Sequence, residues 1–183
     1  MGSKVWGRVV YFLMLSLNVL GQDSASVTQW KRFSVEPAFS YSYSGYSFSS
    51  SFLYRFCKNE FYIGPKIDLS YFNLKSSSPI GIVTGYRYNL PVRPKLNFML
   101  SMDYQNLFIK PLYISETGKG HLNYIQELYL CYGWQLRMLP NLRLGNQMGF
   151  GGYHEHFYDQ YEDIPLELKD AFAFFKLFLG YDF

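Results

Sequence analysis

The closing stretch Phe175-Lys-Leu-Phe-Leu-Gly-Tyr-Asp-Phe183 decides the fold that this sequence predicts. Its odd-numbered residues are all apolar or aromatic, whereas the positions between them include Lys176 and Asp182. Successive side chains of a β-strand point to opposite faces, so the stretch presents one continuous apolar face. Strands of about ten residues with one apolar face build the wall of a transmembrane barrel, which satisfies every backbone group in hydrocarbon. The pattern therefore predicts a transmembrane β-barrel.

The first 21 residues have the pattern of a signal peptide. Lys4 and Arg8 form its basic start, an apolar run follows over 9–20, and cleavage is expected ahead of Gln22. This run is shorter than the ~20 residues that a membrane-spanning helix needs. The alternative is a retained anchor helix. The expected domains are thus a signal peptide over 1–21 and a barrel over 22–183.

The same alternation recurs along the chain and predicts an all-β, eight-stranded, antiparallel up-and-down barrel. The expected strands are 33–43, 48–57, 61–71, 80–90, 96–105, 122–134, 142–150 and 175–183. The expected connections are 44–47, 57–60, 73–79, 91–94, 106–120, 138–141 and 152–169. With both termini in the periplasm, the longer connections fall on the extracellular side, as is typical of outer-membrane barrels.

A soluble lipocalin-like barrel is the alternative, because alternation alone does not distinguish the inner face from the outer face. The aromatic end at Phe183, the many rings near strand ends and the charges on the presumed inner face favour the membrane barrel. The 18 tyrosines agree, since a ring with a polar tip suits a membrane interface. Without Lys4 and Arg8, 15 of the 17 basic residues remain against 14 acidic residues, so the formal net charge of the mature chain is near +1. This near-neutral balance argues against a nucleic-acid partner.

The segments Phe61–Ile67 and Gly81–Tyr88 and the ending at Phe183 resemble the small outer-membrane barrels of the Bacteroidota, which are similar to OmpX/OmpA-type barrels. The resemblance covers the mature chain as a pattern. It implies a place in the outer membrane of a Gram-negative bacterium, among its lipid and lipopolysaccharide. It also implies that the barrel-assembly machinery reads Phe183, with Tyr181 as the preceding outward aromatic, as an assembly signal.

The inward positions of the expected strands carry both basic and acidic residues, which persist in an interior only when they are paired. We therefore expect a charge network in the lumen. Its members are Arg32, Arg55, Lys66, Arg87, Arg143 and Lys176 with Glu36, Asp68, Asp103, Glu127 and Asp182. Large inward rings would lie against inward glycines, which fills an eight-stranded interior and argues against a diffusion pore.

Sites for chemistry are few. The segment His154-Glu-His156, followed by Asp159, is a weak candidate for a divalent metal site, and a solvated acidic loop is the simpler interpretation. Some eight-stranded barrels modify lipid A, but no histidine here has the nearby serine and acid that a hydrolase needs. We therefore expect neither an enzyme nor a cofactor. Cys57 and Cys131 are expected to be free thiols that face the lumen.

Two amides break the outward apolar face, Gln126 and Asn146, on the sixth and seventh expected strands. An amide in lipid costs free energy unless it finds a partner. One interpretation is that the two positions lie at the membrane–water interface or in a local bulge. The other is that they contact another outer-membrane protein. The leading hypothesis is a structural or accessory subunit of a larger secretion, assembly or uptake complex. The alternatives are a stand-alone surface-binding barrel that uses its long loops, and a lipid A-modifying enzyme.

Overall fold

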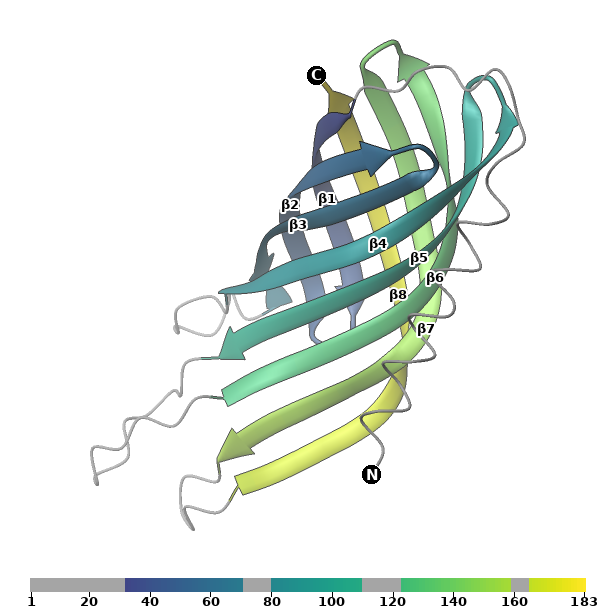
Figure 1. The fold of residues 1–183 in the computed structure, drawn as a ribbon. Coiled ribbons are helices and arrows are strands. Elements are labelled where there is room, and N and C mark those ends of the chain that lie inside the picture. Colours follow the sequence, from purple (N-terminus) through teal and green to yellow (C-terminus); the bar gives the residue numbers. More distant parts are fainter. Residues whose placement is uncertain (1–31, 71–79, 110–122, 159–164) are drawn as a thin grey trace. The chain divides into compact units, whose positions relative to one another are not determined.

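Eight antiparallel strands form a closed barrel in which each strand pairs with its neighbours along the chain and β8 pairs with β1 (Figure 1). The computed structural model describes residues 32–70, 80–109, 123–158 and 165–183. The strands are β1 Phe33–Ser42, β2 Gly45–Phe56, β3 Asn59–Asp68, β4 Ile80–Arg93, β5 Leu96–Ile109, β6 Asn123–Leu139, β7 Leu142–Tyr158 and β8 Pro165–Asp182. The predicted all-β barrel and its strand number are confirmed, whereas the predicted signal peptide over 1–21 lies outside the described residues.

The barrel is apolar outside and charged inside. Leu130 and Phe150 on the outer face are 69% and 75% exposed, whereas Glu36, Arg87 and Arg143 on the inner face are fully buried. A soluble lipocalin-like barrel would have the opposite arrangement, so that alternative is wrong. In the part of the chain that the structure describes, no helix has the length and apolar character needed to cross a membrane.

Several predicted turns are shorter in the structure. The first hairpin turns at residues 43–44, because Ser42 pairs with Gly45. The second turns at 57–58, so that Glu60 belongs to β3 and faces the lumen. Cys57 adopts a positive φ of 54° in this turn and is exposed, which corrects its predicted place in the lumen.

The predicted long loop over 152–169 is wrong, because strands continue through much of it. The predicted loop over 106–120 begins too early, and residues 110–120 lie outside the described residues. β5 runs to Ile109 and β7 runs to Tyr158, where it pairs with Pro165 at the start of β8. The sequence pattern predicted an end to each strand where the outward face turns polar. A hairpin needs no apolar face to keep its backbone hydrogen bonds, so pairing continues beyond that point.

The strands are uneven in length at one end of the barrel. The β1–β2 pair ends at Ser42 opposite Gly45, whereas the β7–β8 pair continues to Tyr158 opposite Pro165. Strands β5 to β8 therefore project past β1 and β2 as an open sheet (Figure 1). We call residues 106–109, 123–127, 152–158 and 165–171 the β5–β8 extension.

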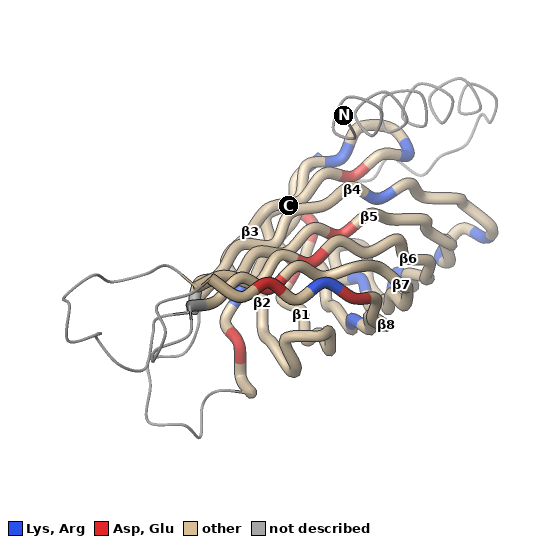
Figure 2. Tube along the Cα trace, turned by 90° about the horizontal axis from the view of Figure 1, so that it is seen from below, with Lys and Arg blue, Asp and Glu red and all other residues tan. Residues whose placement is uncertain are grey.

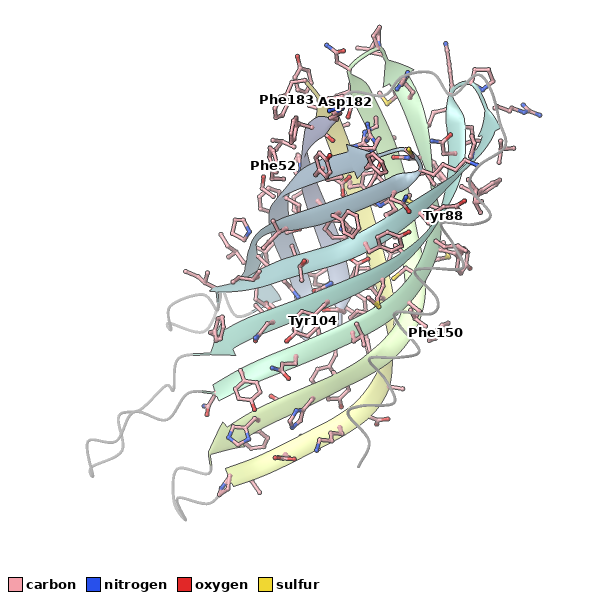
Figure 3. All side chains as sticks on the ribbon, in the orientation of Figure 1. Phe52, Tyr88, Tyr104, Phe150, Asp182 and Phe183 are labelled. Atoms are coloured by element: carbon pink, nitrogen blue, oxygen red, sulfur yellow. The ribbon has the colours of Figure 1, made fainter. Side chains whose placement is uncertain are left out.

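We expect replacement of Phe183 by Asp to reduce barrel assembly strongly. The Phe183 amide donates to the Phe33 carbonyl at 3.1 Å, and its ring lies 6.3 Å from that of Phe52 (Figure 3). A charge there would stand on the lipid-facing side of the closing β1–β8 pair. Heat-modifiable migration of membrane fractions on gels measures the folded amount, and Phe183→Trp serves as the control. Native levels of folded Phe183→Asp would show that the terminal ring is no assembly signal.

Candidate functional site

The lumen near the start of β1 and the end of β8 is occupied by a network of charged side chains. Arg87 on β4 donates to both carboxylate oxygens of Glu36 on β1, at 2.9 and 3.0 Å. It also reaches Glu60 on β3 at 3.0 Å. All three side chains are fully buried, and the bidentate geometry is the strongest form of an arginine–carboxylate pair. Figure 2 shows basic and acidic positions interspersed over the strands rather than gathered in separate patches.

Glu60 is the residue on which this network converges. Its carboxylate accepts from Arg55 at 2.8 Å, from Arg87 at 3.0 Å and from Arg143 at 3.4 Å. The sequence pattern does not predict Glu60 as a lumen residue, because the polar run 57–60 is typical of a turn. The Arg55–Glu60 register between β2 and β3 was the signal that could have found it, since directly opposed charges of opposite sign pair across strands.

Two further anions and a lysine extend the network. Asp182 lies 2.9 Å from Arg143 Nε and 3.7 Å from Arg55. Lys176 lies between Asp103 at 3.4 Å and Glu36 at 3.8 Å. Each charge of this network thus faces at least one opposite charge, which offsets the cost of removing it from water.

A second group of polar contacts lies toward the β5–β8 extension. Lys66 donates to Gln105, to Ser44 Oγ at 3.2 Å and to Glu127 at 3.3 Å. Glu127 also accepts the Ser44 amide at 2.9 Å, which ties the β1–β2 turn to β6. The lumen is therefore crossed by side-chain contacts at both ends.

The structure buries ten of the eleven charged residues predicted for the lumen. These are Glu36, Arg55, Lys66, Asp68, Arg87, Asp103, Glu127, Arg143, Lys176 and Asp182. Arg32 is exposed at the start of β1 and is a correction, because the strand pairing begins one residue after it. Cys131 is buried and free.

Large rings fill the remaining space against glycines. A Cβ on Gly85 would lie 2.4 Å from the Tyr62 ring, and one on Gly145 would lie 2.3 Å from the Phe178 ring. Both contacts are too close for any side chain, so these rings need glycine opposite them. The rings of Tyr62 and Phe178 also flank the Arg87 guanidinium, at 5.2 and 4.4 Å. Rings and paired charges together occupy the interior, as expected for eight strands.

A polar row crosses the outer face of the extension. In register across four strands lie Asn106, Gln126, His154 and Lys169. The next row toward the closed part of the barrel is Tyr104, Leu128, Gly152 and Ala171. Gln126 is thus one member of a continuous polar row where the apolar face ends. Asn146, in contrast, lies in register between Trp134 and Leu177, inside the apolar face.

The weak metal candidates lie on β7 rather than in a loop. His154 and His156 share its outer face, and His154 Nε2 lies 3.5 Å from a Glu167 oxygen. Asp159 lies outside the described residues, and the described residues contain no group of three or more metal-ligating side chains. Glu167 is held by Lys169 at 2.8 Å, and this hydrogen bond lowers the pKa of the exposed carboxyl group.

Tyr43 connects the short β1–β2 hairpin to the extension. Its hydroxyl donates to Glu155 at 2.7 Å, and its ring stacks on Tyr153 of β7. Burial, with the hydrogen bond to Glu155, raises the pKa of Tyr43. The inner face of the extension is otherwise apolar near its end, where Leu166 and Leu168 are 40% and 48% exposed.

Comparison with known proteins supports the fold. The barrel is similar to the N-terminal β-barrel domain of Pseudomonas aeruginosa OprF, with a TM-score of 0.57 and 11% identity over 85% of this chain and 100% of that domain. Neisserial surface protein A gives a TM-score of 0.48 and 13% identity over 82% of this chain and 94% of that protein. At such identity the likeness to the OprF domain shows the outer-membrane barrel fold alone.

Sequence comparison is less informative. No family model matches the chain. A stretch of 110 residues, 55% of the chain, is 31% identical to a UPF0182 protein of Methanospirillum hungatei, of whose length the chain covers 11%.

We expect Glu60→Ala to lower the free energy of unfolding by about 3–5 kcal/mol, because it leaves three buried arginines short of a carboxylate. Urea unfolding in lipid vesicles measures this loss. Glu167→Ala, which removes an exposed carboxylate from the extension, is the control and should cost less than about 1 kcal/mol. Equal effects of the two variants would contradict a stabilising role for the network.

Proposed function

We propose that this chain is an integral outer-membrane barrel of a Gram-negative bacterium that displays the β5–β8 extension at the cell surface as a binding platform. The observation that carries the proposal is the uneven rim, where four strands project past β1 and β2. We also propose that the chain is of the same type as the small outer-membrane barrels of the Bacteroidota, which its segments Phe61–Ile67 and Gly81–Tyr88 resemble.

The filled lumen supports a role for the barrel as a membrane anchor of the extension rather than as a pore or a transporter. Arg87 and Glu60 connect β4 to β3, and Arg143 reaches Glu60 from β7, so paired charges cross the barrel. Tyr62 and Phe178 occupy the space beside them. An interior of this kind stabilises the barrel and leaves the outer surfaces to carry the function.

The lengths of the connections support a cell-surface position for the extension. The short turns at 57–58, 94–95 and 140–141 lie at the end that holds the C-terminus, where the Asp182 amide donates to the Asn141 carbonyl. Outer-membrane barrels have short periplasmic turns and longer extracellular loops. We therefore assign this end to the periplasm and the β5–β8 extension to the cell surface.

Thiol labelling of intact cells with a membrane-impermeant maleimide tests this orientation. Cys57 is exposed in the β2–β3 turn and Cys131 is buried, so the native chain should be labelled only after the outer membrane is permeabilised. In a Cys57→Ser background, Asp170→Cys on the extension should be labelled on intact cells. Labelling of native Cys57 on intact cells, with Asp170→Cys protected, would overturn the proposed orientation.

A second candidate function, that of an accessory subunit in a larger outer-membrane complex, is favoured by Asn146. Its side-chain oxygen is buried and accepts no hydrogen bond from the described residues. If the side chain turns outward, a donor from a neighbouring outer-membrane protein would remove the cost of this amide in the apolar face. Gln126 belongs to the polar row and gives weaker support for such an interface.

We expect Asn146→Leu, alone or with Gln126→Leu, to fold at least as well as the native chain while losing a co-purifying outer-membrane protein. The gain in folding would come from removing an unpaired amide from the lipid-facing side. Mild-detergent purification followed by identification of co-eluting proteins is the measurement, and Met148→Leu on the same face of β7 is the control. Unchanged co-purification of every protein would exclude an interface at Asn146.

A further inference from the structure

One edge of the β5–β8 extension has no neighbouring strand among the described residues. β8 pairs with β7 over its whole length but with β1 only from Phe175 to Asp182. Residues Pro165–Ala171 of β8, here called the β8 edge, are all exposed. An exposed strand edge presents unpaired N–H and C=O groups and is a template for adding another strand.

The hydrogen bonds at the C-terminal end of the chain show which backbone groups point toward this edge. The Phe183 amide donates to Phe33 of β1, whereas the Asp182 amide donates to Asn141, directly before β7. The pairing of β8 with both neighbours has no register shift. Odd-numbered residues of β8 therefore direct their backbone groups to the β1 side, and in the β8 edge these include Glu167 and Lys169.

We propose that the β8 edge pairs antiparallel with the β8 edge of a second copy of this chain, about a two-fold axis at Leu168. This inference rests on the proposed function, since it names the occupant of the surface platform. In this register Glu167 lies opposite Lys169 of the other copy, and Lys169 lies opposite its Glu167. Both residues direct their backbone groups across the edge, so these positions form hydrogen-bonded pairs.

Three neighbouring registers are disfavoured by charge. An axis at Glu167 opposes two glutamates, an axis at Lys169 opposes two lysines, and an axis at Asp170 opposes two aspartates. Directly opposed like charges destabilise a strand pair. Glu167 and Lys169 already contact each other at 2.8 Å on one strand, so the proposed pair completes a square of alternating charges. Leu168 meets its own copy on the inner face.

The symmetry of this contact determines how the two barrels are oriented. The two-fold axis of a continuous antiparallel strand pair is perpendicular to the sheet, and rotation about it reverses the barrel axis. The two barrels therefore belong to facing membranes. A single strand pair is a small contact, but many copies on two apposed surfaces act together. The proposed activity is thus a homotypic link between membrane surfaces.

A charge-swapped variant, Glu167→Lys with Lys169→Glu, tests the register without changing the net charge. The native chain and the swapped variant are reconstituted into separate phosphatidylcholine vesicles, and the two kinds of vesicle carry different dyes. Clustering is followed by light scattering and two-colour microscopy. We expect native vesicles to cluster with native and swapped vesicles with swapped. Mixed contacts should be about tenfold rarer, because every cross-strand pair would then join like charges. Resistance of unboiled samples to detergent denaturation verifies that both variants are folded.

Native vesicles that stay dispersed would overturn the proposal and leave the β8 edge to a strand of another protein. Clusters that mix the two dyes at random would also overturn it, because the contact would then not use Glu167 and Lys169. Neither result depends on the thiol labelling of Cys57 and Asp170→Cys, which separately tests whether the extension faces the cell exterior.

Discussion

The pairing of β8 with β1 is the contact on which the rest of the structure depends. An open sheet cannot stay in hydrocarbon, since each unpaired backbone group there costs several kcal/mol. The pair runs from Ser34 opposite Asp182 to Tyr41 opposite Phe175, and it joins the two ends of the described barrel. Because β1 ends at Ser42 while β8 begins at Pro165, the first part of β8 pairs with β7 but has no strand on its β1 side among the described residues. Closure and the exposed edge thus have one structural origin.

Closure also determines what the interior contains. Alternation directs every second residue into a space too narrow for a channel, so each inward side chain must fit its neighbours. Glu60 satisfies three arginines that come from β2, β4 and β7, and it connects parts of the chain far apart in sequence. Glycines such as Gly85 and Gly145 make room for the rings of Tyr62 and Phe178. The network therefore stabilises one arrangement of the strands, because a shift by one residue would expose these charges to lipid.

The sequence predicted the fold well because the alternation of apolar and polar residues is a direct consequence of the two environments. It predicted the lumen charges for the same reason, apart from Arg32 and Glu60 at strand ends. Strand ends are poorly predicted, since turn residues such as Asn59 and Glu60 also fit a strand that continues. The extension was not predicted, because its outer face carries a polar row and lacks the apolar positions that the alternation requires. His154 and Lys169 were predicted to lie in a loop, whereas they lie in β7 and β8.

The composition of the β8 edge explains how this edge can be exposed without causing general aggregation. Proteins protect exposed edges from general aggregation with proline and with charged residues, lysine above all. Pro165 begins the edge and lacks an N–H, and Lys169 stands near its middle. These features oppose pairing with an arbitrary apolar strand. A strand that places a carboxylate opposite Lys169 and an ammonium opposite Glu167 can pair with the edge, because each charge then meets an opposite charge. The charges that protect the edge are therefore also those that select its partner.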